Sequence, residues 1–144
     1  MPMISDLYNG DILSLAAGLK NEHLEHPAGT ARKVSKLCGS WLEIDLNVKD
    51  GAVSECALRV QACALGQSSA AILQENIIGA NIEELKLARE SLRAMLKANG
   101  KPPSGRFGKL ALLESVREYP ARHTSTMLAF AAAIEAMDMA LAQD

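Results

Sequence analysis

Hydrophobic and polar residues alternate along two neighbouring segments in the first half of the chain. Residues 41–48 form the first run and residues 53–62 the second, with an Asp-Gly turn signal at 50–51 between them. Strict alternation is typical of a strand that buries one face, and Asp-Gly favours a tight hairpin turn. We therefore predict an antiparallel hairpin at about 41–62. The apolar positions of its first strand are Leu42, Ile44, Leu46 and Val48.

Other segments repeat their apolar residues with the helical period of about 3.6 residues. One helix is expected within residues 5–23, beginning near Asp11. Gly79 is placed to end a second helix, and Asn81 with Glu84 forms the signature of a capping box that opens a third. The second helix is predicted to cover 67–78 and the third 82–97, and a final helix is predicted to begin near Pro120.

Two stretches show neither period and are predicted to be connectors. Residues 26–38 begin with a His-Pro pair that interrupts a helix, and they carry several basic side chains, so we expect an irregular solvated segment. Residues 99–105 are rich in proline and glycine and are expected to form a loop before a short apolar turn at 110–116.

Length, charge and composition limit the kinds of protein that this chain can be. The 144 residues suit a single domain, 1–144, without internal repeats. With 15 basic and 17 acidic side chains and 3% aromatic residues, the composition does not favour a nucleic-acid or anionic-membrane partner. We see no secretory leader and no apolar run of about 20 residues, which favours a cytoplasmic protein.

The three cysteines are the main candidates for chemistry. An odd number in a chain without a leader favours reduced thiols or metal ligands over disulfides. Cys56 lies on the apolar face of the second strand and is expected to be a small buried hydrophobe. Cys63 lies where that strand passes into a helix, whose N-terminal amides stabilise a thiolate. Cys38, in a Cys-Gly-Ser turn, is the nearest candidate partner.

Several common catalytic patterns are missing. The sequence contains no glycine-rich phosphate loop, no Gly-x-Ser-x-Gly, no His-Glu-x-x-His and no Cys-x-x-Cys. His123 could serve Cys63 as a base, but no third group is evident to orient it. The standard nucleotide-binding and zinc-protease interpretations therefore fail for this sequence.

A combination of short motifs carries a family resemblance. Cys38-Gly39-Ser40 precedes the hairpin, Ala62-Cys63-Ala64 precedes the second helix, and Tyr119-Pro120-Ala121-Arg122 opens the last helix. In this order the motifs resemble the NifU/IscU/SufU family of iron-sulfur cluster assembly proteins, over roughly residues 7–136. The long insert before the last helix resembles the SufU-type branch, in which an arginine stands at the position of Arg122.

This resemblance implies an α+β fold, a small antiparallel sheet covered by helices. In the family, three cysteines and an aspartate meet at one exposed tip, where they hold a nascent iron-sulfur cluster or a zinc ion. Cys38 and Cys63 match the first two cysteines. Ser40 stands at the aspartate position and Ser125 at that of the third cysteine. Arg122 and His123 are auxiliary candidates, although the helical spacing turns His123 away from Ser125.

The serines at these two ligand positions leave the identity of the cofactor undecided. A serine hydroxyl keeps its proton at neutral pH and is a poor ligand, so the resemblance is compatible with an iron-sulfur cluster, with zinc or with no metal. A homodimer would supply four thiolates to a shared [2Fe-2S] cluster, from Cys38 and Cys63 of each chain.

The leading interpretation is a scaffold-like protein, not an enzyme, that accepts sulfur or holds a transferable cluster through Cys38 and Cys63. The partners implied are a cysteine desulfurase and iron-sulfur acceptor proteins. The alternatives are a zinc-dependent sulfur acceptor and a metal-free interaction or regulatory protein of the desulfurase system. The second alternative could use a basic strip on the third helix, formed by Lys86, Arg89, Arg93 and Lys97.

Overall fold

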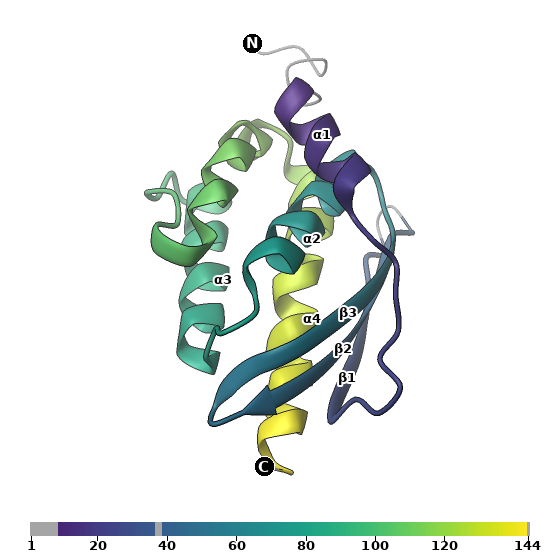
Figure 1. Cartoon of the computed structure of the whole chain (residues 1–144). Coiled ribbons are helices and arrows are strands. Elements are labelled where there is room, and N and C mark those ends of the chain that lie inside the picture. Colours follow the sequence, from purple (N-terminus) through teal and green to yellow (C-terminus); the bar gives the residue numbers. More distant parts are fainter. Residues whose placement is uncertain (1–8, 37–38, 144) are drawn as a thin grey trace.

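A three-stranded sheet packs against a group of helices in the computed structural model, which describes residues 9–36 and 39–143 (Figure 1). This is the α+β architecture that the resemblance implies. The elements in chain order are α1 (Gly10–Gly18), β1 (Gly29–Val34), β2 (Trp41–Lys49), β3 (Ala52–Gln61), α2 (Ala64–Asn76), α3 (Ile82–Lys97), η2 (Gly105–Glu118), η3 (Pro120–Arg122) and α4 (His123–Leu141).

The predicted hairpin is confirmed as β2 and β3, which pair antiparallel. Its turn uses Asp50 and Gly51 with positive φ angles of 53° and 79°, the conformation that an Asp-Gly turn favours. Leu42 lies opposite Val60, and Ile44 lies opposite Leu58. The alternating apolar residues therefore share the inner face of the sheet, which packs on α4.

The expectation that residues 26–38 form an irregular connector is wrong for the stretch Gly29–Val34, which forms the edge strand β1. The alternation was hidden because the inward positions hold small or charged side chains. At Gly29 an added Cβ would lie 1.9 Å from the carbonyl oxygen of Ala136 in α4, so the helix lies directly on the strand. Lys33, also inward in register, forms an ion pair with Glu135 of α4.

The first helix is shorter than predicted. It begins where expected, with the Asn9 side chain accepting a hydrogen bond from the amide of Ile12, but it ends at Gly18. Residues 19–28 then run as an extended strap beside β3 (Figure 1). The amide of Glu22 donates to the carbonyl oxygen of Leu58 over 3.0 Å. Glycine at position 18 favours this early end, since it is a poor helix former.

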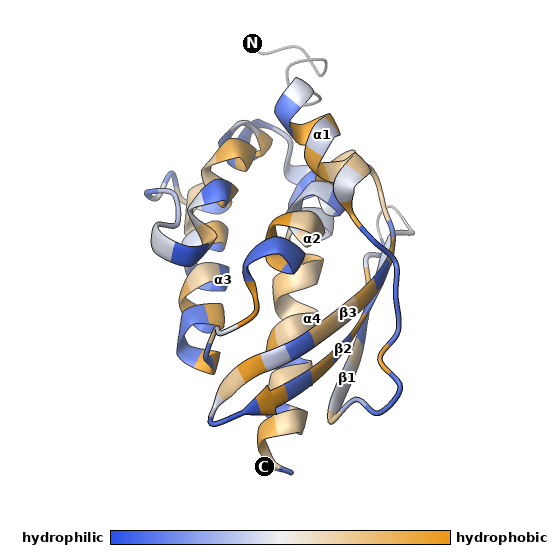
Figure 2. Ribbon diagram, in the orientation of Figure 1, coloured by the Kyte–Doolittle hydropathy of each residue, from blue (hydrophilic) through white to orange (hydrophobic). Residues whose placement is uncertain are grey.

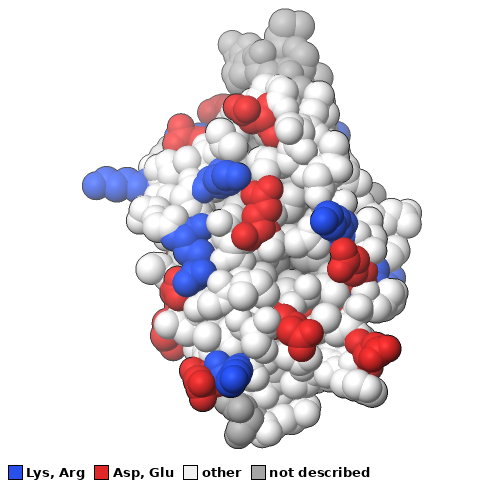
Figure 3. All heavy atoms as spheres, in the orientation of Figure 1, with Lys and Arg blue, Asp and Glu red and all other residues white. Residues whose placement is uncertain are grey.

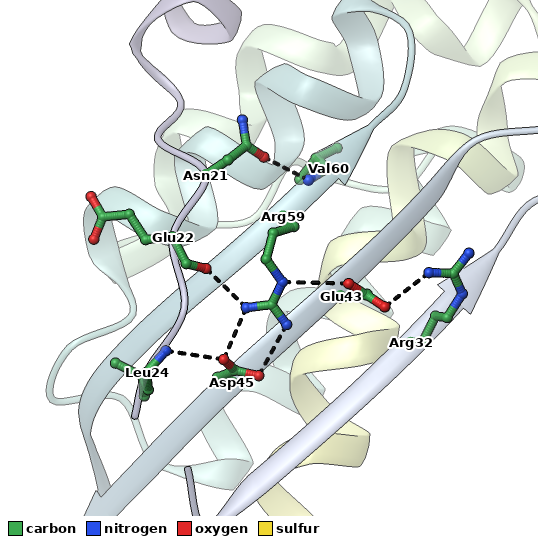
Figure 4. Close-up of polar contacts among 8 residues, drawn as sticks. All are labelled: Asn21, Glu22, Leu24, Arg32, Glu43, Asp45, Arg59 and Val60. Carbon is green, nitrogen blue, oxygen red and sulfur yellow. Dashed lines mark hydrogen bonds and ion pairs between the residues drawn. The ribbon is translucent and has the colours of Figure 1, made fainter. Parts of the chain in front are cut away.

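Charged side chains on the outer face of the sheet hold the strap in place (Figure 4). Arg59 of β3 donates two hydrogen bonds to Asp45 of β2 and one to the carbonyl oxygen of Glu22. Asp45 also accepts a hydrogen bond from the amide of Leu24 over 3.1 Å. The strap is thus bonded both to the edge of β3 and to a pair of charges on the sheet.

Helix α4 lies at the centre of the core, against the sheet on one side and α2 and α3 on the other (Figure 2). Among the described helices, the segment Pro120–Leu141 is long and apolar enough to cross a membrane, but 61% of its most apolar window is buried inside the fold. Its hydrophobicity is accounted for by this packing. Phe130 is fully buried and meets Phe107 edge to face, with ring centroids 5.3 Å apart.

The remaining helical predictions hold with adjusted bounds. The capping box of Asn81 and Glu84 is present, and Gly79 has a φ of 90°. The predicted turn at 110–116 is part of the longer 3₁₀ helix η2, and Pro120 lies in the 3₁₀ turn that precedes α4. The buried residues of η2 recur every third position, as three residues per turn require, and are Phe107, Leu110, Leu113 and Val116.

Candidate functional site

A hollow of about 260 Å³ opens at the end of the sheet opposite the hairpin turn. Elements from three parts of the chain meet there: the turn before β2, the junction of β3 with α2, and the 3₁₀ turn before α4. The lining residues are Gly39, Ser40, Gln61, Ala62, Cys63 and Arg122. The structure therefore brings Ser40, Cys63 and Arg122, all singled out from the sequence, to one place.

Cys63 is the N-cap residue of α2 and is a free, partly exposed thiol. Its carbonyl oxygen accepts the first helical hydrogen bond from the amide of Gln67, over 3.0 Å. The side-chain amide of Gln67 donates to the carbonyl oxygen of Ala62 over 3.0 Å, which secures the turn from strand to helix. The thiol itself makes no capping hydrogen bond to the helix. Its sulfur thus remains available to groups from outside α2.

Ser125, in the first turn of α4, is the group that meets this sulfur. The Sγ atom of Cys63 and the Oγ atom of Ser125 lie 3.6 Å apart, a hydrogen bond in which either group can donate. Ser125 is 1% exposed. The two positions are 62 residues apart in sequence, so only the packing of α2 on α4 joins them.

Gly66 makes this contact possible, and sequence reasoning missed its role. A Cβ atom at position 66 would lie 2.8 Å from the Oγ atom of Ser125 and 2.9 Å from the Cβ atom of Ala62. The available signal was a glycine inside the first turn of a helix, where it is intrinsically unfavourable unless close packing requires it.

Ser40 also lines the hollow, directly before β2. Its carbonyl oxygen accepts from the amide of Ser35 over 2.8 Å, and the carbonyl oxygen of Ser35 accepts from the amide of Gly39 over 2.8 Å. Gly39 has a φ of 73°, which favours glycine. Cys38 lies outside the described residues, so its predicted pairing with Cys63 stays a prediction.

The two auxiliary candidates differ in their surroundings. Arg122 lines the hollow, and in the described ranges 9–36 and 39–143 its guanidinium makes no ion pair. His123 is 5% exposed, and its Nε2 atom lies 3.0 Å from the carbonyl oxygen of Val116 in η2. That contact engages one ring nitrogen of His123 with the backbone before α4.

Cys56 lies on the inner face of the sheet, as the sequence predicts, but it is partly rather than fully buried. It packs against the hydrophobic core beneath the sheet. Burial, with a smaller contribution from the charge of Asp45, raises the pKa of the Cys56 thiol to about 12. Cys56 is therefore a protonated, structural thiol at neutral pH.

The donor atoms that the described residues place around the hollow are too few for a resident metal ion. Within the described parts of the chain, no three His, Cys, Asp or Glu side chains come close enough to hold a metal. A tetrahedral zinc site needs four such ligands, or three with a water molecule, whereas the described lining offers one thiol beside an arginine. Neutral serine hydroxyls do not replace the missing thiolate and carboxylate.

Charges of both signs are interspersed on the face shown in Figure 3. This agrees with the small net charge of −2. The four side chains of the basic strip on α3 are all exposed, and one of them, Arg93, pairs with Glu90.

Comparisons with known proteins identify the family and the fold. Residues 8–126 match the NifU-like N terminal domain family. The iron-sulfur cluster assembly scaffold protein IscU of Thermotoga maritima is 29% identical over 100 residues, which cover 69% of this chain and 70% of that protein.

Two crystal structures share the fold. A nitrogen-fixing NifU-like protein (N-terminal) from Brucella abortus is 41% identical, with a TM-score of 0.94 over 99% of this chain and 100% of that one. A putative iron-sulfur cluster assembly scaffold protein for the SUF system from Fervidobacterium islandicum has a TM-score of 0.84 at 18% identity, over 94% of this chain and 99% of that one. The match over residues 8–126 and the first of these structures show that the chain belongs to the NifU-like N-terminal domain family of iron-sulfur cluster assembly scaffolds.

Proposed function

We propose that this chain works in iron-sulfur cluster assembly as a scaffold-type sulfur acceptor, with Cys63 as the accepting residue. The observation that carries the proposal is the position of Cys63, a free thiol at the start of α2 that lines an open hollow. The amides at the start of a helix favour negative charge on a neighbouring sulfur, and thiolates are the nucleophiles of sulfur transfer.

The proposed step is a transfer between thiols that needs no added oxidant or reductant. The thiolate of Cys63 attacks the terminal sulfur of a cysteine persulfide on a desulfurase. The sulfur–sulfur bond of the donor breaks as a new one forms on Cys63, and the donor cysteine leaves as a thiolate. The proton that Cys63 lost to solvent is balanced by the proton that the departing thiolate takes up.

Cys38 is proposed as the second thiol of the site. Together the two cysteines would hold iron-sulfur cargo weakly enough for transfer to an acceptor protein. Two chains sharing one cluster would complete four thiolate ligands, the number that a [2Fe-2S] cluster requires. We further propose a cytoplasmic location, no catalytic turnover, and no nucleic-acid or membrane partner.

A second candidate function is a metal-free interaction or regulatory protein of the desulfurase system. The observation that favours it is the lack of any three-residue metal-ligand group in the described parts of the chain. The exposed strip of Lys86, Arg89, Arg93 and Lys97 would then serve as a contact for an acidic partner surface.

Sulfur transfer separates the two candidates. The purified chain is incubated with a cysteine desulfurase and cysteine, and each thiol is examined for an added sulfur atom by peptide mass spectrometry. We expect added sulfur on Cys63, and its loss in Cys63→Ala. Cys56→Ala is the matched control and should accept sulfur normally. Desulfurase binding without sulfur on Cys63 would support the interaction protein, and absence of both would contradict both functions.

Cluster holding is tested separately by anaerobic reconstitution with iron and sulfide. Visible absorption and metal analysis of the wild type are compared with those of Cys38→Ala and Cys63→Ala. A cluster that disappears in both variants supports the cargo role. A cluster that persists in either variant contradicts the proposed pair of ligands.

A further inference from the structure

We infer that the Ser125 hydroxyl makes Cys63 an acceptor for sulfur that does not retain a divalent metal ion. This inference rests on the proposed function, because it concerns the same hollow, but its tests need no desulfurase. Ser125 acts as a positioning residue, since it works through the sulfur of Cys63.

The first step of the argument is the hydrogen-bonding capacity of the pair. The Oγ atom of Ser125 lies 3.6 Å from the Sγ atom of Cys63, and a hydroxyl can both donate and accept. While Cys63 is a thiol, its S–H can donate to the serine oxygen. Once Cys63 is a thiolate, the serine O–H can donate to its Sγ atom. In a persulfide the negative charge lies on the outer sulfur, and Sγ becomes an anion again only when that sulfur leaves. The contact therefore suits the thiol that is loaded and the thiolate that attacks or departs.

The second step is the effect of the same contact on metal binding. Ser125 occupies the nearest position from which α4 could offer a second ligand to an ion at Cys63. A protonated hydroxyl there is a weak ligand for zinc or iron. Arg122 adds a positive charge to the lining, which disfavours a cation and favours an anion. The described lining thus suits an anionic sulfur group better than a metal ion.

The third step is that the geometry is imposed by packing. Ser125 is 1% exposed, and Gly66 leaves no room for a further atom between α2 and the serine. This packing therefore holds the serine hydroxyl in place beside the sulfur of Cys63. A thiol placed at position 125 would face Cys63 across the same short gap.

Zinc alone is the probe for the metal part of the inference. Cys63 is alkylated with iodoacetamide under anaerobic, reducing conditions, with and without one equivalent of zinc, and modification is read peptide by peptide. We expect zinc to leave the alkylation rate of Cys63 unchanged in the wild type and in Ser125→Ala. In Ser125→Cys we expect zinc to slow it at least about tenfold, because a bound thiolate is not free to react. Protection in the wild type, or none in Ser125→Cys, would overturn the inference.

Inorganic polysulfide is the probe for the sulfur part. It loads Cys63 chemically, and the added sulfur is then passed to an excess of a small thiol, a step that is followed by mass spectrometry. The small thiolate attacks the outer sulfur, and Cys63 leaves as a thiolate to which the Ser125 O–H donates. A hydrogen bond to a charged group is strong enough to change such a rate by about tenfold, so the added sulfur should leave Ser125→Ala about ten times more slowly than the wild type. Ser54→Ala, an exposed serine on β3, is the matched control and should match the wild type. Equal rates in Ser125→Ala and wild type would contradict the role of the hydroxyl.

The two proposals can fail separately. If the zinc and polysulfide results are as expected but a desulfurase does not load Cys63, the sulfur-acceptor function fails and the role of Ser125 stands. If a desulfurase loads Cys63 while both probes show no effect of Ser125, the inference fails alone.

Discussion

The guanidinium of Arg59 binds the carboxylate of Asp45 through two parallel hydrogen bonds, of 2.9 Å and 3.0 Å (Figure 4). The side chains are only 15% and 7% exposed. Because Asp45 also accepts from the amide of Leu24, the pair joins two strands of the sheet to the strap at 19–28. An ion pair of this kind is costly to break, since the remaining charge stays largely buried.

Asp45→Asn should therefore destabilise the protein markedly. The substitution keeps the shape of the side chain but leaves Arg59 with only the more exposed carboxylate of Glu43, 3.4 Å from its Nε atom, so we expect the free energy of unfolding to fall by about 2 kcal/mol. Urea unfolding followed by circular dichroism measures the change. Glu90→Gln breaks the exposed pair with Arg93 and serves as the control, with no measurable effect expected. Equal stability of Asp45→Asn and the wild type would show that the pair does not hold the strap.

Stability should also decrease in acid. Burial raises the pKa of Asp45, but the hydrogen bonds from Arg59 and Leu24 and the charge of Arg59 outweigh this effect and leave the pKa below its ordinary value. A carboxylate with a lowered folded-state pKa contributes stability above its unfolded pKa, and that contribution is lost as the pH falls through the folded value.

We expect the free energy of unfolding to drop as the pH falls below about 4, where an unperturbed aspartate titrates. Asp45→Asn should show a shallower drop over the same range, because it lacks the titrating group. Unfolding curves at a series of pH values test this. An identical pH dependence in the variant would assign the acid sensitivity to other carboxylates, such as Glu43.

Gly66→Ala should disturb the contact between α2 and α4 at the site. The added methyl group would lie 2.8 Å from the Oγ atom of Ser125, so the helices must separate or the serine must turn away. Overpacking of this kind costs about 1–3 kcal/mol and exceeds the gain of about 1 kcal/mol from replacing glycine in a helix.

Gly18→Ala is the matched control, since a Cβ atom at that position in α1 meets nothing within 4 Å. Its melting temperature should equal or exceed that of the wild type. Thermal unfolding of both variants distinguishes crowding from a general effect of alanine. A Gly66→Ala protein as stable as Gly18→Ala would mean that α2 and α4 can separate freely.

Cys56 should resist modification in the folded protein. Burial and the nearby charge of Asp45 raise its pKa to about 12, so almost no thiolate forms at pH 8. Iodoacetamide at pH 8 should modify Cys63 and leave Cys56 intact until the chain is unfolded in urea. Peptide mass spectrometry reads both sites in one sample. Rapid native labelling of Cys56 would show that the core beneath the sheet opens readily.

Elements set by local sequence were predictable. The hairpin at 41–62 follows from strict alternation and an Asp-Gly turn, and α3 follows from its apolar period and the capping box of Asn81 and Glu84. In both cases the residues that specify the element are neighbours in sequence. The strand β1 was missed because its inward positions are small or charged and leave no hydrophobic alternation to detect; at Gly29 the small residue admits α4.

The sequence by itself determined the hairpin and its passage into a helix at Cys63, and it made that thiol the candidate reactive group, because a strand that ends in cysteine before a run of small residues predicts a thiol at a helix start. It also supplied the family resemblance, which the comparisons confirm. Only the tertiary structure decided what stands beside that thiol. Ser125 meets Cys63 through the packing of α2 on α4, at a separation that Gly66 permits, and contacts between residues 62 positions apart depend on packing rather than on local pattern.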